Sequence, residues 1–321
     1  MNSFGTYVTK RIISSIFSIF LITIVVFLIV HLLPGDPVRS MLGADADQAA
    51  VDATRKMLNL DKPLITQYIS WLKGVLHGDF GRSLVMNVDI ADLLKSRIPI
   101  SLAITLPAFV IASIIGILIG IACAIHRGSA LDQTLTVFIT TLSGIPDFWI
   151  GILMMFLFGV NLKLLPTMGY TSPFVNFGDY LSHAILPIMV LSLVSIADSA
   201  RQMRTNMLDV LNQDYIRTAK ANGLSIISIR YKHALKNTLV PIITLMVLQV
   251  RSLIGGSLLI EQIFSIPGMG RLIFTSVQSN DYLVIQALVL VISVIVIFCN
   301  LLLDISYGLI DPRIRATRKE V

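Results

Sequence analysis

Charged residues are scarce in this chain. They account for 14% of its 321 residues, against about a quarter in a typical soluble domain. Hydrophobic residues account for 55%, and the mean hydropathy is +0.81. We therefore expect lipid, rather than water, to surround most of the chain. Cysteine is also nearly absent: Cys123 and Cys299 both lie inside apolar runs, which excludes a disulfide framework.

The sequence also lacks the motifs of several enzyme classes. No Gly-Lys dipeptide occurs, so there is no P-loop to bind phosphates, and any ATP must be hydrolysed by another polypeptide. The only glutamates, Glu261 and Glu320, belong to no His-Glu-x-x-His zinc motif. The net charge of +6 comes without a basic stripe interleaved with aromatics, which argues against nucleic-acid binding. We expect no enzyme, no metal site and no cofactor bound by this chain.

Long apolar runs are what the chain has instead. A helix needs about 20 apolar residues to cross the hydrocarbon core of a bilayer. The alternating pattern of a membrane β-barrel is absent, so we predict an all-α integral membrane protein with six transmembrane helices. In the second run, Gly116 and Gly120 form a GxxxG pattern that permits close helix contact. The expected spans are 12–33, 98–125, 134–160, 183–200, 237–260 and 282–305.

The distribution of Lys and Arg predicts how these spans are oriented. The segments that face the cytoplasm when the N-terminus is inside hold 14 of these residues, and the short outer loops 161–182 and 259–281 hold one each. Both termini are therefore expected to be cytoplasmic. The first run is too long for a signal peptide and is followed by turn-forming residues 33–37 rather than a cleavage site, so we expect an uncleaved helix.

This topology predicts how the chain is organised. A helix is expected outside the membrane, with Asp61 as its N-cap, Pro63 in its first turn and Gly78 after its end. Its one-sided apolar pattern suits a helix resting on the membrane surface and also a docking surface for an extracytoplasmic partner. The expected parts are the first helix with an extracytoplasmic segment (1–97), a five-helix core (98–310) and a cytoplasmic tail (311–321).

The polar segment 201–236 separates two apolar runs and is long for a connection in a compact bundle. Residues 209–222 are predicted to form one helix, which ends at Gly223 in a left-handed conformation. Residues 225–236 are predicted to form a second helix. Two helices joined at a glycine corner would make a rigid, projecting elbow.

Small and basic side chains occur together at this corner. Ala219 and Ala221 would let a partner surface approach closely, and Arg217 and Lys220 would pair with acidic groups on it. The same residues would also occur in a solvated loop that has no partner, because cytoplasmic loops of membrane proteins are rich in Lys and Arg. Both interpretations stay open at this point.

Two ionisable residues fall inside expected spans. Asp147 and Arg251 each lie about 20 Å from the inner end of their span, at about 1.5 Å per residue. Such groups are costly in lipid and by default suggest function. Equal depth suits a structural ion pair, and it also suits a shared position on a wetted translocation pathway. Asp198 and Asp304 lie near the inner surface and are expected to be structural.

The corner of the polar segment resembles the coupling loop of ABC importer permeases. The general pattern of that family is Glu-Ala-Ala, three residues and Gly; here Arg217-Thr218-Ala219 stands first, so the glutamate is missing. Arg-Thr-Ala is common in the dipeptide, oligopeptide, glutathione and nickel branch, to which the chain is similar. The matching run is Asp214-Tyr215-Ile216-Arg217-Thr218-Ala219-Lys220-Ala221-Asn222-Gly223, with His233, Asn237 and Pro241 downstream.

Further motifs of that branch occur in order along nearly the whole chain. They are the motifs at 33–37, 78–81, 145–149, 165–166, 261–270 and 311–315. The resemblance implies a type I ABC importer permease fold whose coupling loop docks on an ATP-hydrolysing subunit. The residues that it assigns to this coupling are Asp214, Tyr215, Arg217, Thr218, Ala219, Ala221, Gly223 and His233.

The resemblance implies a permease subunit in the bacterial cytoplasmic membrane that moves di- or oligopeptides, or similar small solutes, inward by alternating access. The expected partners are a second homologous permease, two ATP-binding cassette subunits that use the ATP, an extracytoplasmic substrate-binding protein and membrane lipid. A nickel importer of the same branch, which the outer His31, His77 and His183 would serve, is one alternative. A freestanding channel or secondary carrier, which the depth match of Asp147 and Arg251 would suit, is another.

Overall fold

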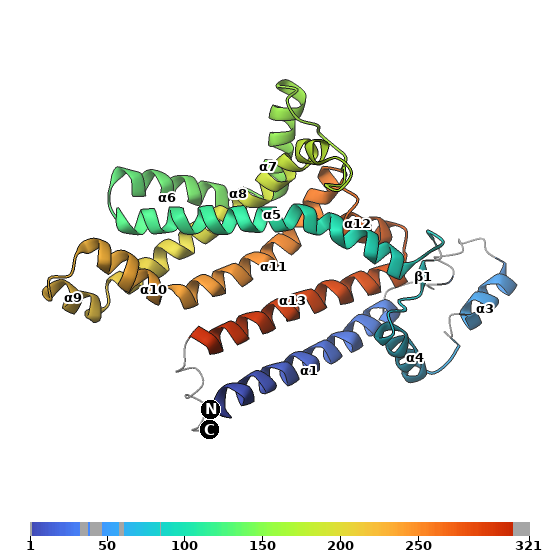
Figure 1. The fold of residues 1–321 in the computed structure, drawn as a ribbon. Coiled ribbons are helices and arrows are strands. Elements are labelled where there is room, and N and C mark those ends of the chain that lie inside the picture. Colours follow the sequence, from blue (N-terminus) through green and yellow to red (C-terminus); the bar gives the residue numbers. More distant parts are fainter. Residues whose placement is uncertain (1, 33–37, 39–46, 58–60, 84, 311–321) are drawn as a thin grey trace. The chain divides into compact units, whose positions relative to one another are not determined.

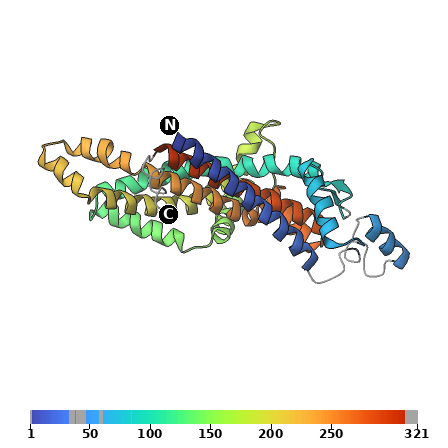
Figure 2. The same cartoon turned by 90° about the horizontal axis from the view of Figure 1, so that it is seen from below.

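The computed structural model describes residues 2–32, 38, 47–57, 61–83 and 85–310. The motifs at 33–37 and 311–315 and the expected tail 311–321 lie outside these residues. Helix dominates because a backbone in lipid has to satisfy its own hydrogen bonds. Figures 1 and 2 show the helices from two directions. The elements before the second long helix are α1 (Asn2–Leu32), α3 (Gln48–Met57), α4 (Leu64–Leu76), β1 (Arg82–Ser83) and β2 (Val88–Asp89).

The remaining elements carry most of the apolar sequence. They are α5 (Ile90–Ile125), α6 (Ala130–Ser143), α7 (Asp147–Met154), the π-helical η1 (Met155–Asn161), α8 (Phe177–Leu211), α9 (Asp214–Ala221), the π-helical η2 (Ser228–Ala234), α10 (Leu235–Asn237), α11 (Leu239–Ile263), α12 (Met269–Gln278) and α13 (Tyr282–Ile310).

The membrane spans match the predicted ones except for the third. In the described part of the chain, five helices are long and apolar enough to cross a bilayer: Phe4–Ile29, Ile90–Ile125, Phe177–Leu211, Pro241–Ile263 and Tyr282–Leu309. The expected third span over 134–160 is not one continuous helix, because Ala130–Ser143 and Asp147–Asn161 meet at an angle of 99°. The bend falls at Gly144-Ile145-Pro146, where a helix ends and proline begins the next one. Six spans result only if this bent pair counts as one.

The chain divides into two compact units, the first made of Met1–Arg11, Leu102–Ile266 and Cys299–Val321. Within this unit α8 packs against α6, α7 and α11, and α5 approaches α8 closely at the GxxxG pattern. A Cβ atom on Gly116 would lie 2.7 Å from that of Ser199, and one on Gly120 would lie 2.6 Å from that of Met203. No side chain fits at either position, so the predicted close helix contact is confirmed.

The second unit comprises Ile12–Ser101 and Pro267–Phe298. A short hairpin pairs β1 with β2, and the buried Ser83 donates a hydrogen bond to the carboxylate of the buried Asp281. This bond ties the hairpin to the residue that precedes α13. Apolar residues of α5, α12 and α13 form the core of the unit. They are Ile90, Leu93, Leu94, Met269, Leu272, Val284, Ala287 and Leu288.

The helix expected outside the membrane exists as α4. Its N-cap is Pro63 rather than the predicted Asp61, and no side chain caps it. Two of its aromatic residues, Tyr68 and Trp71, pack on Phe27 of α1. The hydroxyls of Tyr68 and Thr23 are hydrogen-bonded at 2.8 Å. The apolar face of α4 therefore rests in part on the first long helix.

Candidate functional site

The polar segment between α8 and α11 folds into two helices joined by a tight turn. We call residues 214–237, from α9 to α10, the elbow. In both views the elbow extends beyond the end of α8 (Figures 1 and 2). The prediction of one helix over 209–222 is wrong: α8 continues to Leu211, and Gln213 has an extended backbone before α9 begins. Asp214 in the first turn of α9 favours this new start, because a carboxylate stabilises a helix N-terminus.

Gly223 ends α9 as predicted, with a φ angle of +77°. The N–H of Gly223 donates to the carbonyl of Lys220 at 3.0 Å, and the N–H of Leu224 donates to the carbonyl of Ala219 at 3.2 Å. This pair of bonds is a Schellman motif, which requires a left-handed residue at its centre. The next helical stretch begins at residue 226 and runs through η2 and α10. The predicted glycine corner and second helix are therefore confirmed.

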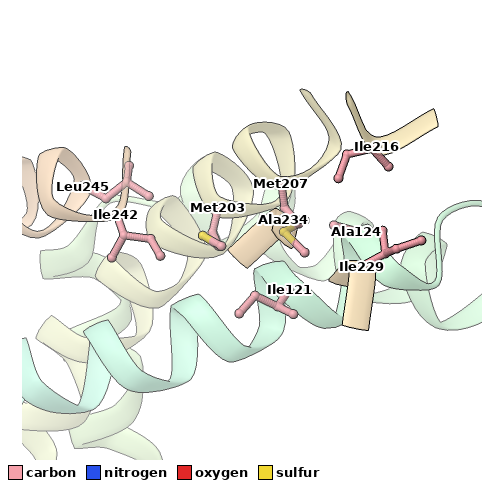
Figure 3. Packing of buried hydrophobic residues seen from close by; sticks show 9 residues of the cluster. All are labelled: Ile121, Ala124, Met203, Met207, Ile216, Ile229, Ala234, Ile242 and Leu245. Carbon is pink, nitrogen blue, oxygen red and sulfur yellow. The ribbon is translucent and has the colours of Figure 1, made fainter. Parts of the chain in front are cut away.

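An apolar core fixes the elbow to the long helices (Figure 3). Ile216 of α9 and Ala234 of η2 are fully buried in it, and Ile229 is nearly so. We call this cluster the elbow core. Its members come from α5, α8, α9, η2 and α11: Ile121, Ala124, Met203, Met207, Ile216, Ile229, Ala234, Ile242 and Leu245. One apolar core therefore joins the elbow to three long helices.

The outer surface of the elbow is apolar as well as basic. Ile226 and Ile227 are 61% and 71% exposed, and Tyr231 is 56% exposed. Large apolar side chains beyond the end of a bundle favour contact with another protein. Sequence reasoning missed them, although Ile226 and Ile227 directly follow the glycine turn. The basic residues exposed on the same elbow are Arg217, Lys220, Lys232 and Lys236.

The structure separates the predicted coupling residues into outward and inward groups. Arg217 is exposed and forms a 3.4 Å ion pair with Asp214 on the same helix. Ala221 is exposed, as is Thr218, whose hydroxyl donates to the Asp214 carbonyl at 3.2 Å. Ala219, however, packs against the elbow core. Ala219 is only partly buried there, so its contact with a partner stays a prediction.

Tyr215 and Asn237 link the two helices of the elbow. The side-chain amide of Asn237 donates to the Tyr215 hydroxyl at 2.8 Å and to the His233 carbonyl at 3.0 Å. The first of these bonds crosses from α10 to α9. Tyr215 is also 41% exposed, so it contributes both to the hydrogen bond between α9 and α10 and to the outer surface.

Asp147 and Arg251 lie apart in the described structure and form no ion pair with each other. Arg251 is exposed and donates a hydrogen bond to the side-chain oxygen of Asn300. Asp147 begins α7, and its Oδ2 atom lies 2.8 Å from where a Cβ on Gly256 would be. Gly256 is five residues, or about 7 Å, beyond Arg251 along α11. The two residues therefore contact different partners, and their shared position on a translocation pathway stays a prediction.

An ion pair that sequence reasoning missed joins α6 to α8. The Nε and Nη2 atoms of Arg204 donate to the two carboxylate oxygens of Asp132 at 2.7 and 2.8 Å. The Asp132 side chain is 4% exposed, and the backbone N–H of Gly128 also donates to it. Asp198 pairs with Arg201, and Asp304 pairs with Arg11. The structural interpretation of Asp304 agrees with its contact, whereas Asp198 keeps one carboxylate oxygen without a partner among the described residues.

No group of three or more His, Cys, Asp or Glu residues that could hold a metal ion occurs within the described ranges. Of the outer histidines, His77 is hydrogen-bonded to the carbonyl of Lys73, and His183 lies 3.5 Å from Asp179. The side chain of His31 lies outside the described residues.

Comparisons with known proteins agree with this architecture. Residues 116–316 match the family model "Binding-protein-dependent transport system inner membrane component", and residues 5–105 match the model of the N-terminal part of such components. A probable peptide ABC transporter permease protein, y4tP of Sinorhizobium fredii, is 36% identical over 97% of this chain and 99% of its own length. The glutathione transport system permease protein GsiC of Escherichia coli (strain K12) is 39% identical over 96% of this chain and 98% of its own length.

A solved structure shares the fold at lower identity. The MetNI methionine ABC transporter, in an inward-facing conformation, matches with a TM-score of 0.55 and 18% identity over 68% of this chain and 96% of that chain. The resemblance to ABC importer permeases is thereby confirmed. The chain belongs to the family of binding-protein-dependent transport system inner membrane components and is a multi-pass inner membrane protein with the type I ABC importer permease fold.

Proposed function

We propose that this chain is the permease subunit of an ATP-driven importer for di- or oligopeptides or glutathione-like solutes. The observation that carries the proposal is the elbow, which offers an exposed surface to a partner and shares its apolar core with three long helices. The names of the peptide and glutathione relatives support this solute class. The sequence has no P-loop, so the ATP would be bound by separate subunits and no cofactor by this chain.

The coupling step follows from how the elbow is built. In the proposal, the elbow and both termini lie in the cytoplasm, and α9 docks on an ATP-binding cassette subunit. Ile226, Ile227 and Tyr231 would supply apolar contact area, while Arg217 and Lys220 would meet acidic side chains. When the two ATPase subunits close on ATP, the displacement passes through Ile216 and Ile229 into the elbow core. The long helices would then move with the elbow rather than independently of it.

The remaining partners complete the cycle. A second homologous permease would form the other half of the pathway, and an extracytoplasmic binding protein would deliver the solute. Alternating access requires ligands that bind the inward-facing and outward-facing states unequally. ATP, acting through the cassette subunits, and the loaded binding protein would supply that difference in binding free energy. This chain would be the element that switches between the two states.

Uptake into sealed vesicles tests the proposal. The permease pair is reconstituted with or without its ATPase subunits, and radiolabelled dialanine or glutathione is presented by the binding protein. Uptake is expected only with the ATPase subunits and ATP. Uptake by the permeases alone, driven by an ion gradient, would identify a secondary carrier and contradict the proposal. Replacing the organic solute by Ni²⁺ in the same vesicles tests the nickel alternative.

A further inference from the structure

A polar cavity of about 170 Å³ lies between α8 and α11. Six of the eight residues around it are polar, although both helices are apolar enough to cross a membrane. Polar groups at such positions are costly in lipid and by default suggest function. The lining residues are Ser195, Asp198, Ser199 and Gln202 of α8, and Leu245, Leu248, Gln249 and Ser252 of α11.

Most of the polar groups on this wall are unused. The hydroxyls of Ser195, Ser199 and Ser252 and the side-chain amide of Gln202 make no hydrogen bond to any residue that the structure describes. Ser195 and Ser199 are nevertheless buried, at 5% exposure each. Buried polar groups in proteins nearly always have a hydrogen-bond partner. The hydroxyls of Ser195 and Ser199 are therefore free to bond water or a solute that enters the cavity.

Asp198 provides the only charge on the wall, and only one of its oxygens is engaged. The Oδ1 atom accepts from Arg201 Nη2 at 2.9 Å and from Ser143 Oγ at 3.2 Å. The Oδ2 atom accepts no hydrogen bond within the described ranges. It is therefore available to a cationic group in the cavity.

Gln249 gives the second, independent sign of a ligand. Its side chain is 6% exposed, and its Oε1 atom accepts from Ser113 Oγ at 2.9 Å, whereas its Nε2 atom is buried without a partner. The amide nitrogen of Gln286 on α13 is also buried without a partner. Gln286, however, does not line this cavity. An unused donor on α11 and an unused carboxylate oxygen on α8 thus occur among the residues that line this cavity.

We infer that this cavity binds the amino-terminal end of a small zwitterionic solute on its way through the permease. The ammonium group would bind Asp198 Oδ2, and the adjoining carbonyl oxygen would accept a hydrogen bond from Gln249 Nε2. Leu245 and Leu248 would contact the apolar side chain of the solute. The inference rests on the proposed function and specifies which chemical feature of the solute the permease itself recognises.

The size of the cavity limits what it holds. A volume of about 170 Å³ corresponds to about five or six water molecules at about 30 Å³ each. Pockets that enclose a whole drug-sized ligand have about 300–1,000 Å³. The cavity therefore receives one end of a peptide and leaves the rest outside, which makes it a subsite for the terminus.

Protection of an introduced thiol tests the subsite directly. Ser252→Cys is placed in a Cys123→Ala, Cys299→Ala background of the assembled, nucleotide-free importer in nanodiscs and labelled with a cationic methanethiosulfonate. Dialanine is the probe, and N-acetyl-dialanine, which lacks the ammonium group, is its matched compound. Labelling is expected to slow about fivefold when dialanine reaches about four times its dissociation constant. N-acetyl-dialanine should have no effect, and an exposed Thr140→Cys on α6 should be protected by neither compound.

Variants of the amide complete the test. Gln249→Leu and the nearly isosteric Gln249→Glu both remove the donor and should abolish protection at Ser252→Cys. Gln286→Leu is the matched control and should preserve protection. Equal protection by N-acetyl-dialanine would mean that the ammonium group is not recognised. No saturable protection by dialanine would mean that the cavity holds only water. Either result would overturn the inference. ATP-dependent uptake is measured on the same preparation, so loss of the subsite is distinguished from failure of the proposed function.

Discussion

Gly223 offers the sharpest test of the elbow, because its replacement by alanine changes only the backbone preference. A Cβ atom added at this position would have no other atom within 4 Å, so no steric clash arises. The φ angle of +77° costs a residue other than glycine about 1–2 kcal/mol. A penalty of that size lowers the ratio of chains with the turn formed to chains with the turn unfolded by about 5–30-fold. Asparagine tolerates this conformation better than alanine does, whereas proline cannot adopt it.

Gly223→Pro carries a further cost. It removes the N–H that donates to Lys220, a bond worth about 1 kcal/mol, in addition to fixing φ near −65°. The expected order of ATP-driven uptake is therefore glycine, asparagine, alanine and proline, with uptake abolished in the last. Uptake is measured in proteoliposomes, and retention of the ATPase subunits is measured by affinity purification through the permease.

Gly255→Ala is the matched control for this series. It also meets no atom within 4 Å, but it lies in α11 without a positive φ angle, so helix propensity favours it slightly. Its uptake should equal that of the unmodified chain. The reasoning is refuted if Gly223→Pro, correctly inserted and at equal abundance, transports at the unmodified rate. It is also refuted if Gly223→Ala and Gly255→Ala behave alike.

Two further predictions concern the elbow core and the α6–α8 ion pair. Ile216→Ala should destabilise the docking of α9 by about 2–5 kcal/mol and lower the thermal stability of the complex. Ile227→Ala, at a 71% exposed position, should change stability by no more than about 0.5 kcal/mol but weaken retention of the ATPase subunits. Equal melting curves for the two variants would contradict this division. Asp132→Asn should lower the free energy of unfolding by about 3 kcal/mol or more, because Arg204 loses its carboxylate partner. The apolar double variant Asp132→Leu, Arg204→Met should recover most of that loss in a thermal unfolding assay. A double variant no more stable than Asp132→Asn would argue against a simple ion pair.

Local chemistry explains which features were predictable from the sequence. Apolar run length predicts spans because the thickness of the bilayer sets the length of the helix. The Gly223 corner was predictable because a left-handed helix end requires glycine whatever packs around it. The GxxxG contact of α5 was predictable because Gly116 and Gly120 lie one turn apart on the same face.

The predictions that failed concern features that depend on contacts between distant parts of the chain. The 99° bend between α6 and α7 was hidden by an apolar composition that continues on both sides of Gly144 and Pro146. Once the span bends, counting residues no longer measures depth, so Asp147 contacts α11 beside Gly256 and Arg251 bonds to Asn300.

The sequence by itself determined the membrane class, the spans apart from the bend, and the glycine corner, because bilayer thickness and backbone sterics act on neighbouring residues. Ser195, Ser199 and Gln202 even recur at helical spacing as a polar stripe that could have been noticed. Only the tertiary structure decided that this stripe meets Gln249, or that Ala219 packs against the elbow core, because packing brings together residues far apart in the sequence.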